Sequence, residues 1–281
     1  MKPSGLSTLL AGLVALSSAS IAHAAEWKVG NVDANAGGDF AGAVTSYVIS
    51  DPDGSGPAPK ATLTAWSNTL NGTNTKLESA YMDSWAWNNF AGNSADDGYD
   101  LGIRNKDYIA RTGQAADAGE NASPEHSIDN NDRYDMVLFK FDSAIQLDAI
   151  KVGWYQTDTD MTVLAYTGSG SVDMANYANG YADVKTSNGW TLVGHINGGA
   201  ANDQTFTISN KVTASYWLIG AYNPTTGFGA STNTSINAGN DYLKLYSVVG
   251  SQPTTQVPEP ATLGLLGIGL LGLVRLRRRQ R

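Results

Sequence analysis

The sequence predicts an all-β protein whose body is an antiparallel β-sandwich of jelly-roll-like type. Short runs of alternating or apolar residues recur along the chain between turn-forming residues, as strands and hairpin loops do. No long stretch has the periodicity of an amphipathic helix. The chain has 281 residues and no cysteine, so the body must be held together by burial without disulfides, which a chain of this length allows.

The N-terminus predicts a secretory signal peptide over residues 1–24. Lys2 gives a positive start, an apolar run follows, and Ala22 and Ala24 form an A-x-A cleavage pattern before Ala25. These three parts in this order are typical of export, and the stretch is short for a spanning helix. A buried N-terminal helix is the alternative. We expect the Sec translocon to export the chain and Ala25 to be the first mature residue.

The body is predicted to span residues 25–249. In the run 134–141, Val137, Phe139 and Phe141 fall on one face, which is the alternation of a half-buried strand. Further runs share this alternation or are apolar throughout. The predicted strands are 61–66, 134–141, 145–155, 161–166, 190–196, 204–209, 215–222 and 242–249.

The stretch from about Asn68 to Asn131 has a different composition. It is rich in Asn, Asp, Gly and Ala, with aromatic residues gathered between Tyr81 and Phe90. This composition predicts long irregular loops or short helices at one end of the sandwich. Residues 250–256 are small and polar and contain proline, so they are predicted to be a linker.

The charge of the body excludes one class of partner. The body has 12 basic residues once Lys2 and the five terminal arginines are left out, and 25 acidic residues once Glu259 is left out. Its formal net charge is therefore about −13. A surface this acidic repels nucleic acid and attracts cations. We therefore expect no nucleic-acid binding.

The C-terminal segment 257–281 has three parts that no folded domain requires. Val257, Pro258, Glu259 and Pro260 come first, and an apolar run over 261–274 follows. The run is short for a bilayer but can span one if the membrane thins and the flanking arginines reach the interface. The chain then ends in a basic cluster, which the positive-inside rule places in the cytoplasm. This cluster contains Arg275, Arg277, Arg278, Arg279 and Arg281.

This tail closely resembles the PEP-CTERM sorting signal of Gram-negative bacteria. That signal is a Pro-Glu-Pro motif, one transmembrane stretch and a terminal arginine cluster, and it is recognised by a membrane protease called exosortase. The resemblance implies an inner-membrane precursor cleaved near Pro258–Pro260 and delivered to the cell surface or the extracellular polysaccharide matrix.

The body extends the resemblance. The stretch from Ser123 to Gly250, with TDTDMTVLAYTG and GNDYLKLYSVVG, looks like the core of one group of exosortase-dependent surface proteins. This likeness implies the same surface role. No activity is generally assigned to that group, so it supplies no catalytic residues, and we expect no enzymatic activity.

A candidate Ca²⁺ site lies before the strand predicted at 134–141. Glu125, Asp129 and Asp132 offer the hard oxygen ligands that Ca²⁺ prefers. The alternative is an Asx-rich loop whose side chains cap their own backbone, which is favoured because EF-hand spacing is absent.

Two further sets of residues have a structural and a functional interpretation. Asp158 and Asp160 could form a pair of acid/base carboxylates, although a solvated strand start explains them more simply. Trp154, Trp190 and Trp217 could stack on sugars, but each falls within a predicted strand and is expected in the core.

Three functions remain open at this point. The first is a non-enzymatic surface protein associated with extracellular polysaccharide or biofilm. The second is a carbohydrate-binding module, with Ca²⁺ as a possible cofactor, and the third is a glycan-acting enzyme. Ordered aromatic residues around a shallow groove would favour the binding module, and a deep pocket with two facing carboxylates would favour the enzyme.

Overall fold

The structure is a computed structural model, and it describes the body of the chain with several gaps. The described residues are 24–29, 45–50, 52–54, 58–68, 76–86, 99–106 and 124–253. The predicted sorting segment 257–281, its apolar run and Ala22 lie outside these residues.

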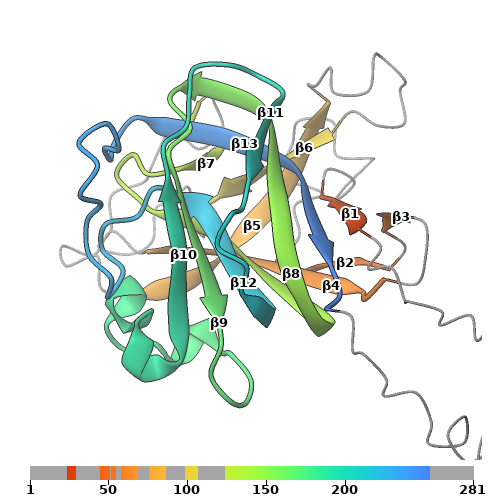
Figure 1. The fold of residues 1–281 in the computed structure, drawn as a ribbon. Helices are drawn as coiled ribbons and strands as arrows, with labels where there is room; N and C mark the ends of the chain where they lie inside the picture. Colours follow the sequence, from red (N-terminus) through yellow and green to blue (C-terminus); the bar gives the residue numbers. More distant parts are fainter. Residues whose placement is uncertain are drawn as a thin grey trace, which may run out of the picture. The chain divides into compact units, whose positions relative to one another are not determined.

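The described residues form thirteen strands that join in one hydrogen-bonded sheet with antiparallel pairing (Figure 1). This confirms the predicted all-β class. The two layers of the predicted sandwich are continuous with each other, because single strands pass from one layer into the other. The strands are β1 (Ala24–Lys28), β2 (Tyr47–Ile49), β3 (Asp53–Gly54), β4 (Ala61–Asn68), β5 (Leu77–Ala86), β6 (Tyr99–Arg104), β7 (Ile128–Asp129), β8 (Asp135–Thr157), β9 (Met161–Tyr166), β10 (Trp190–Ile196), β11 (Gln204–Thr207), β12 (Thr213–Ala221) and β13 (Asp241–Ser251).

Strand β8 is the element that joins the layers. Its first part, residues 135–141, lies between β4 and β12, and its second part, residues 146–157, lies between β13 and β11. The sequence predicted two strands here, 134–141 and 145–155, with the exposed Asp142 and Ser143 between them. The backbone instead continues through them as one bent strand of 23 residues, which is how corners form between packed sheets.

The sheet closes on itself. Strands β8, β4, β5, β6 and β13 pair in that order, and β13 pairs with β8 again. Strand β1 pairs along its whole length with β13, from Ala24 opposite Ser251 to Lys28 opposite Ser247. The last strand therefore extends two residues into the predicted linker, through Gly250 and Ser251. Strand β3 pairs with the other side of β1.

Two apolar cores lie on the two faces of the sheet formed by β10, β9, β12 and β8. On β12, Trp217 and Ile219 enter the main core inside the closed sheet, while Tyr216 and Leu218 enter a second core on the outer face. Such alternation is dictated by the two-residue period of a strand. The second core is covered by the segment 167–189, which includes η3 (Met174–Asn176), η4 (Gly180–Asp183) and η5 (Thr186–Asn188).

The prediction of loops or short helices between Asn68 and Asn131 is wrong in part, because β5, β6 and β7 lie there. The strands were missed because charged residues are buried among the apolar ones there. Asp83 on β5 and Arg104 on β6 are almost fully buried and form an ion pair with 3.0 Å between Nη2 and Oδ2. Because the two charges neutralise each other, these residues can be buried in strands. The sequence then lacks the apolar pattern by which a buried strand is usually predicted.

Candidate functional site

The predicted Ca²⁺ ligands Glu125, Asp129 and Asp132 do not form a group whose carboxylate oxygens lie within 4.8 Å of one another. Asp129 Oδ1 accepts a hydrogen bond from the Asn131 backbone N–H at 3.0 Å, and Glu125 Oε1 accepts one from Asn131 Nδ2 at 3.1 Å. Asp132 is exposed and has a φ of 58°. These contacts are those of an Asx-rich turn. The assignment of Glu125, Asp129 and Asp132 to Ca²⁺ stays a prediction.

The structure instead brings three other carboxylates together. One oxygen each from Asp158, Asp160 and Asp241 lies within 4.8 Å of the others, the single such group of three among the described residues. We call these three residues the acidic cluster. Asp158 and Asp160 lie between β8 and β9, Asp241 opens β13, and Asp158 and Asp241 form a parallel bridge. The expected solvated strand start is wrong for Asp160, which is fully buried like Asp241.

The buried members of the acidic cluster hold three loops in place. Asp160 accepts hydrogen bonds from the backbone N–H groups of Gly198 at 2.8 Å and Asn237 at 3.0 Å. Asp241 Oδ1 accepts from the Asp160 backbone N–H at 3.0 Å, and Asp241 Oδ2 accepts from the Asn130 amide. Each buried oxygen therefore has a donor already, as in a structural crosslink between distant segments.

The electrostatics of the acidic cluster are unfavourable for three negative charges. Burial raises the pKa of Asp241 to about 8, and the neighbouring Asp160 carboxylate adds to this shift. Burial likewise raises the pKa of Asp160, although the hydrogen bonds from Gly198 and Asn237 oppose the change. A proton held within the cluster relieves the repulsion, and a divalent cation bound by the same oxygens would do so as well.

A second group of buried charges lies where β5, β6 and β13 meet. Lys244 on β13 is 4% exposed, and burial lowers its pKa to about 7, while the carboxylates of Asp100 and Asp83 oppose that change. Its Nζ lies 5.0 Å from the ring centre of Trp154, a cation–π contact. Trp154 is half-buried, whereas Trp190 and Trp217 are fully buried in the cores as expected.

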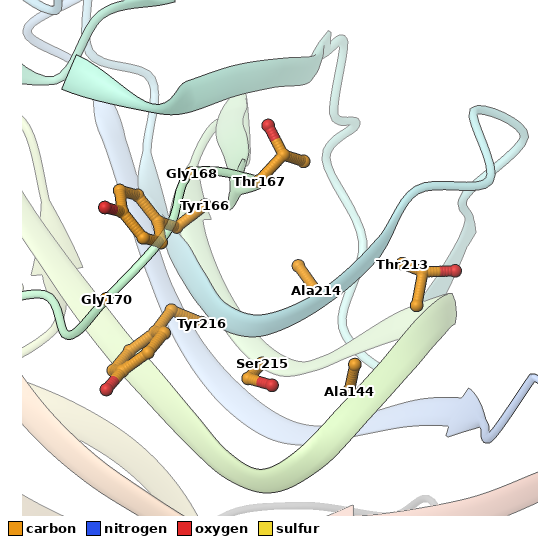
Figure 2. A pocket seen from close by; sticks show the side chains of 9 residues that line it. All are labelled: Ala144, Tyr166, Thr167, Gly168, Gly170, Thr213, Ala214, Ser215 and Tyr216. Atoms are coloured by element: carbon orange, nitrogen blue, oxygen red, sulfur yellow. The ribbon is translucent and has the colours of Figure 1, made fainter.

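An open hollow of about 270 Å³ lies on the outer face of the sheet, beside the segment that covers the second core. We call it the tyrosine hollow. Figure 2 shows the rings of Tyr166 and Tyr216 at one end, Thr213 and Ala144 toward the other, and Ala214 between them. Thr167 and Ser215 also contribute to the lining. Sequence reasoning missed this site because its residues come from β8, β9 and β12, and no local motif joins them.

These observations define an all-β body with an acidic cluster, buried charge pairs and a small aromatic hollow. The part of the chain that the structure describes contains no helical segment of membrane-spanning length and hydrophobicity.

The chain carries a PEP-CTERM protein-sorting motif at residues 256–279, where the family model of that motif matches. The resemblance of the tail to this sorting signal is thereby confirmed. The motif implies exosortase-dependent export through a membrane-anchored precursor.

Comparison with curated proteins gave no match. Two solved structures of discoidin II from Dictyostelium discoideum, one native recombinant and one wild-type, align with 14% and 16% identity. The alignments cover 64% of this chain, 58% and 57% of the discoidin chains, and have TM-scores of 0.26 and 0.25. The matched part is thus less than two thirds of the discoidin chains, and values this low support no functional inference.

Proposed function

We propose that this is an exported, non-enzymatic surface protein that exosortase sorts and cleaves, and that its body associates with extracellular polysaccharide. The observation that carries the proposal is the sorting motif at residues 256–279. Strand β13 ends at Ser251, before this motif begins, so a cut near Pro258–Pro260 leaves every described strand in the mature protein.

The chemistry of the tail supports a protease substrate. Two prolines flank Glu259 and disfavour helix, so the backbone here can be presented in extended form. The run 261–274 holds the segment at the inner membrane, and the arginines behind it resist transfer across the bilayer.

The test is the fate of the precursor in its own host. The variant with Pro258→Ala, Glu259→Ala and Pro260→Ala is expected to stay in the inner-membrane fraction with an intact C-terminus. Mass spectrometry of each fraction measures the cut, and a strain lacking exosortase should reproduce the same intact precursor. The matched control replaces Thr254 and Thr255 with alanine and should be trimmed normally.

The arginine cluster has its own expected outcome. Deleting residues 275–281 should let the tail slip through the membrane or be degraded, because the charge that fixes it in the cytoplasm is gone. If the Pro258–Pro260 variant is trimmed to the same mature mass and reaches the surface in equal amount, the tail is a plain anchor and the proposal fails.

A second candidate function is a carbohydrate-binding module, and the tyrosine hollow is the observation that favours it. A glycan-acting enzyme is less well supported. The buried oxygens of Asp160 and Asp241 already accept N–H groups, so this pair is occupied in structural bonds.

A further inference from the structure

The tyrosine hollow exists because the pairing of β8 with β12 is interrupted. Ala214 pairs with Ile145, but the next pair joins Tyr216 to Lys140. Ser215 alone therefore faces the β8 residues 141–144, and the two strands separate around it. Bulges of this kind re-aim side chains and often lie beside binding sites. The hollow is thus built by the backbone and is present without a ligand.

One wall of the hollow is an aromatic ring held in a fixed position. The Tyr166 hydroxyl donates to the Ser169 carbonyl at 2.8 Å, and the ring packs edge-on against Trp190 with 5.5 Å between centres. A Cβ at Gly189 would lie 2.7 Å from the Tyr166 ring, so only glycine leaves room for it there. A preorganised ring loses little entropy when a ligand packs against it.

The floor of the hollow offers hydroxyl groups with unused hydrogen-bonding capacity. Ser215 and Tyr216 line the hollow, and neither hydroxyl makes a hydrogen bond to another residue of the described ranges. Neither oxygen is a buried, unsatisfied atom, so both can reach solvent or a ligand. Each hydroxyl can donate one hydrogen bond and accept others, which suits a partner that also carries hydroxyls.

The lining carries no formal charge. None of the nine residues around the hollow is Asp, Glu, Lys, Arg or His. Within the lining, an anionic ligand finds no counter-charge and a cationic ligand finds no carboxylate, although Lys140 pairs with Tyr216 beside the lining. Its volume of about 270 Å³ is just below the range of about 300–1,000 Å³ typical of larger ligands, which suits a single ring.

We propose that the tyrosine hollow binds one ring of a neutral, polyhydroxylated sugar in an extracellular polysaccharide. The C–H face of the sugar packs on the Tyr166 ring, and its hydroxyls bond to Ser215 and Tyr216. This inference rests on the proposed function, because surface delivery is what brings the body into contact with polysaccharide.

Affinity electrophoresis of the full chain, purified in a detergent without a sugar headgroup, tests the proposal. The gels contain dextran, laminarin or galactomannan as neutral probes, or alginate as an anionic one. At least one neutral probe is expected to slow the protein, and alginate is not. If no neutral probe slows it, or if alginate slows it equally, the proposal is overturned.

Three variants locate the site. Ala144→Trp fills the hollow from a half-buried position and should abolish binding. Tyr216→Phe removes one hydroxyl and should weaken binding roughly two- to tenfold. Thr205→Trp, on the exposed face of β11 and outside the lining, is the matched control and should bind like the wild type.

Each result of the variant series either supports or overturns the proposal. Wild-type binding by both Ala144→Trp and Tyr216→Phe places the ligand elsewhere and overturns the proposal. The Tyr216→Phe result counts even if Ala144→Trp does not fold, because that change leaves the ring in place. All three variants should be trimmed and reach the surface normally in the host. If a protein is not sorted, the proposed function is wrong. If a protein is sorted but binds no polysaccharide, only the proposal for the tyrosine hollow is wrong.

Discussion

Individual buried charges shape the stability of this protein, and two of them respond to pH in opposite directions. The folded pKa of Asp241 is about 8, above its ordinary 3.8. Its stabilising contribution is fully present below the unfolded pKa and is lost as pH rises from about 4 to 8. The folded pKa of Lys244 is about 7, below its ordinary 10.5. Its contribution is present above 10.5 and is lost as pH falls through about 7.

Asp241→Asn should therefore flatten the pH dependence of unfolding on the acid side. In the wild type, the free energy of unfolding should fall by up to about 1.4 kcal/mol per pH unit between about pH 4.5 and 6.5, because the folded state holds the extra proton. The asparagine variant cannot titrate, so this part of the slope should disappear. Urea unfolding of the full chain at several pH values measures the slope.

The matched control for this prediction is Asp142→Asn, at an exposed position of β8. It should keep the wild-type slope. The asparagine at 241 also loses one of the two N–H contacts that the carboxylate makes, so a lower stability than the wild type is expected at acid pH, and this difference should shrink as pH rises toward 8. An unchanged slope in Asp241→Asn would show that another group takes up the proton.

At the level of strands, the contact between β12 and β8 depends on a glycine. A Cβ at Gly220 would lie 2.1 Å from the Asp135 carbonyl oxygen and 2.7 Å from Met136 Cα. Both atoms belong to the backbone, so neither can move aside without shifting β8. Gly220→Ala should reduce the free energy of unfolding by about 1–3 kcal/mol or more, measured by urea denaturation.

A second glycine provides the comparison. A Cβ at Gly194 on β10 meets no atom within 4 Å. Gly194→Ala should be neutral or slightly stabilising, because alanine reduces the freedom of the unfolded chain. Equal stability of the two alanine variants would contradict the idea that backbone contact fixes β8 against β12.

The strands from β8 to β13 could be predicted because their buried positions are apolar, as in the alternation of Val137, Phe139 and Phe141. The bend within β8 could not, because exposed Asp142 and Ser143 look the same in a turn and in a bent strand. β5 and β6 were hidden for another reason. Their buried Asp83 and Arg104 are compatible with a strand only as a pair, and the pairing is a property of the fold.

The candidate sites were harder to predict than the strands. Asp160 and Asp241 are 81 positions apart, and only the fold brings the connection between β8 and β9 beside the start of β13. Likewise, the tyrosine hollow arises from a register shift between β8 and β12, which leaves no signal in composition or spacing. By contrast, the sorting motif could be predicted from sequence because a linear segment carries it whole.

For the whole molecule, the first and last strands of the body must meet. β1 begins at Ala24, beside the predicted cleavage bond, and pairs with β13, whose end leads to the sorting segment. The body cannot complete this pairing until β13 has crossed the membrane. The predicted signal cleavage next to Ala25 would also require an accessible backbone, since a paired strand cannot enter a protease. Export in an unfolded state, as through the Sec translocon that we expect, would satisfy both requirements.

Trp27 is the side chain on β1 that secures this closure. It is 1% exposed, its Nε1 donates to the Pro59 carbonyl at 2.8 Å, and its ring packs edge-on against Phe141 with 4.9 Å between centres. Trp27→Ala should cost about 3–5 kcal/mol, which is a large share of the roughly 5–15 kcal/mol typical of a whole domain. Urea unfolding measures the loss, and Trp154→Ala, at a half-buried position, should cost less.

The same substitution should also reduce the yield of mature protein in the host. A body that cannot hold β1 against β13 exposes apolar surface after export, and proteases remove such chains. The sorting segment itself is unchanged, so trimming at the motif should continue for those molecules that survive. The expected result is less surface protein of the correct mature mass. Accumulation of an untrimmed precursor would instead mean that exosortase reads the folded body as well as the tail.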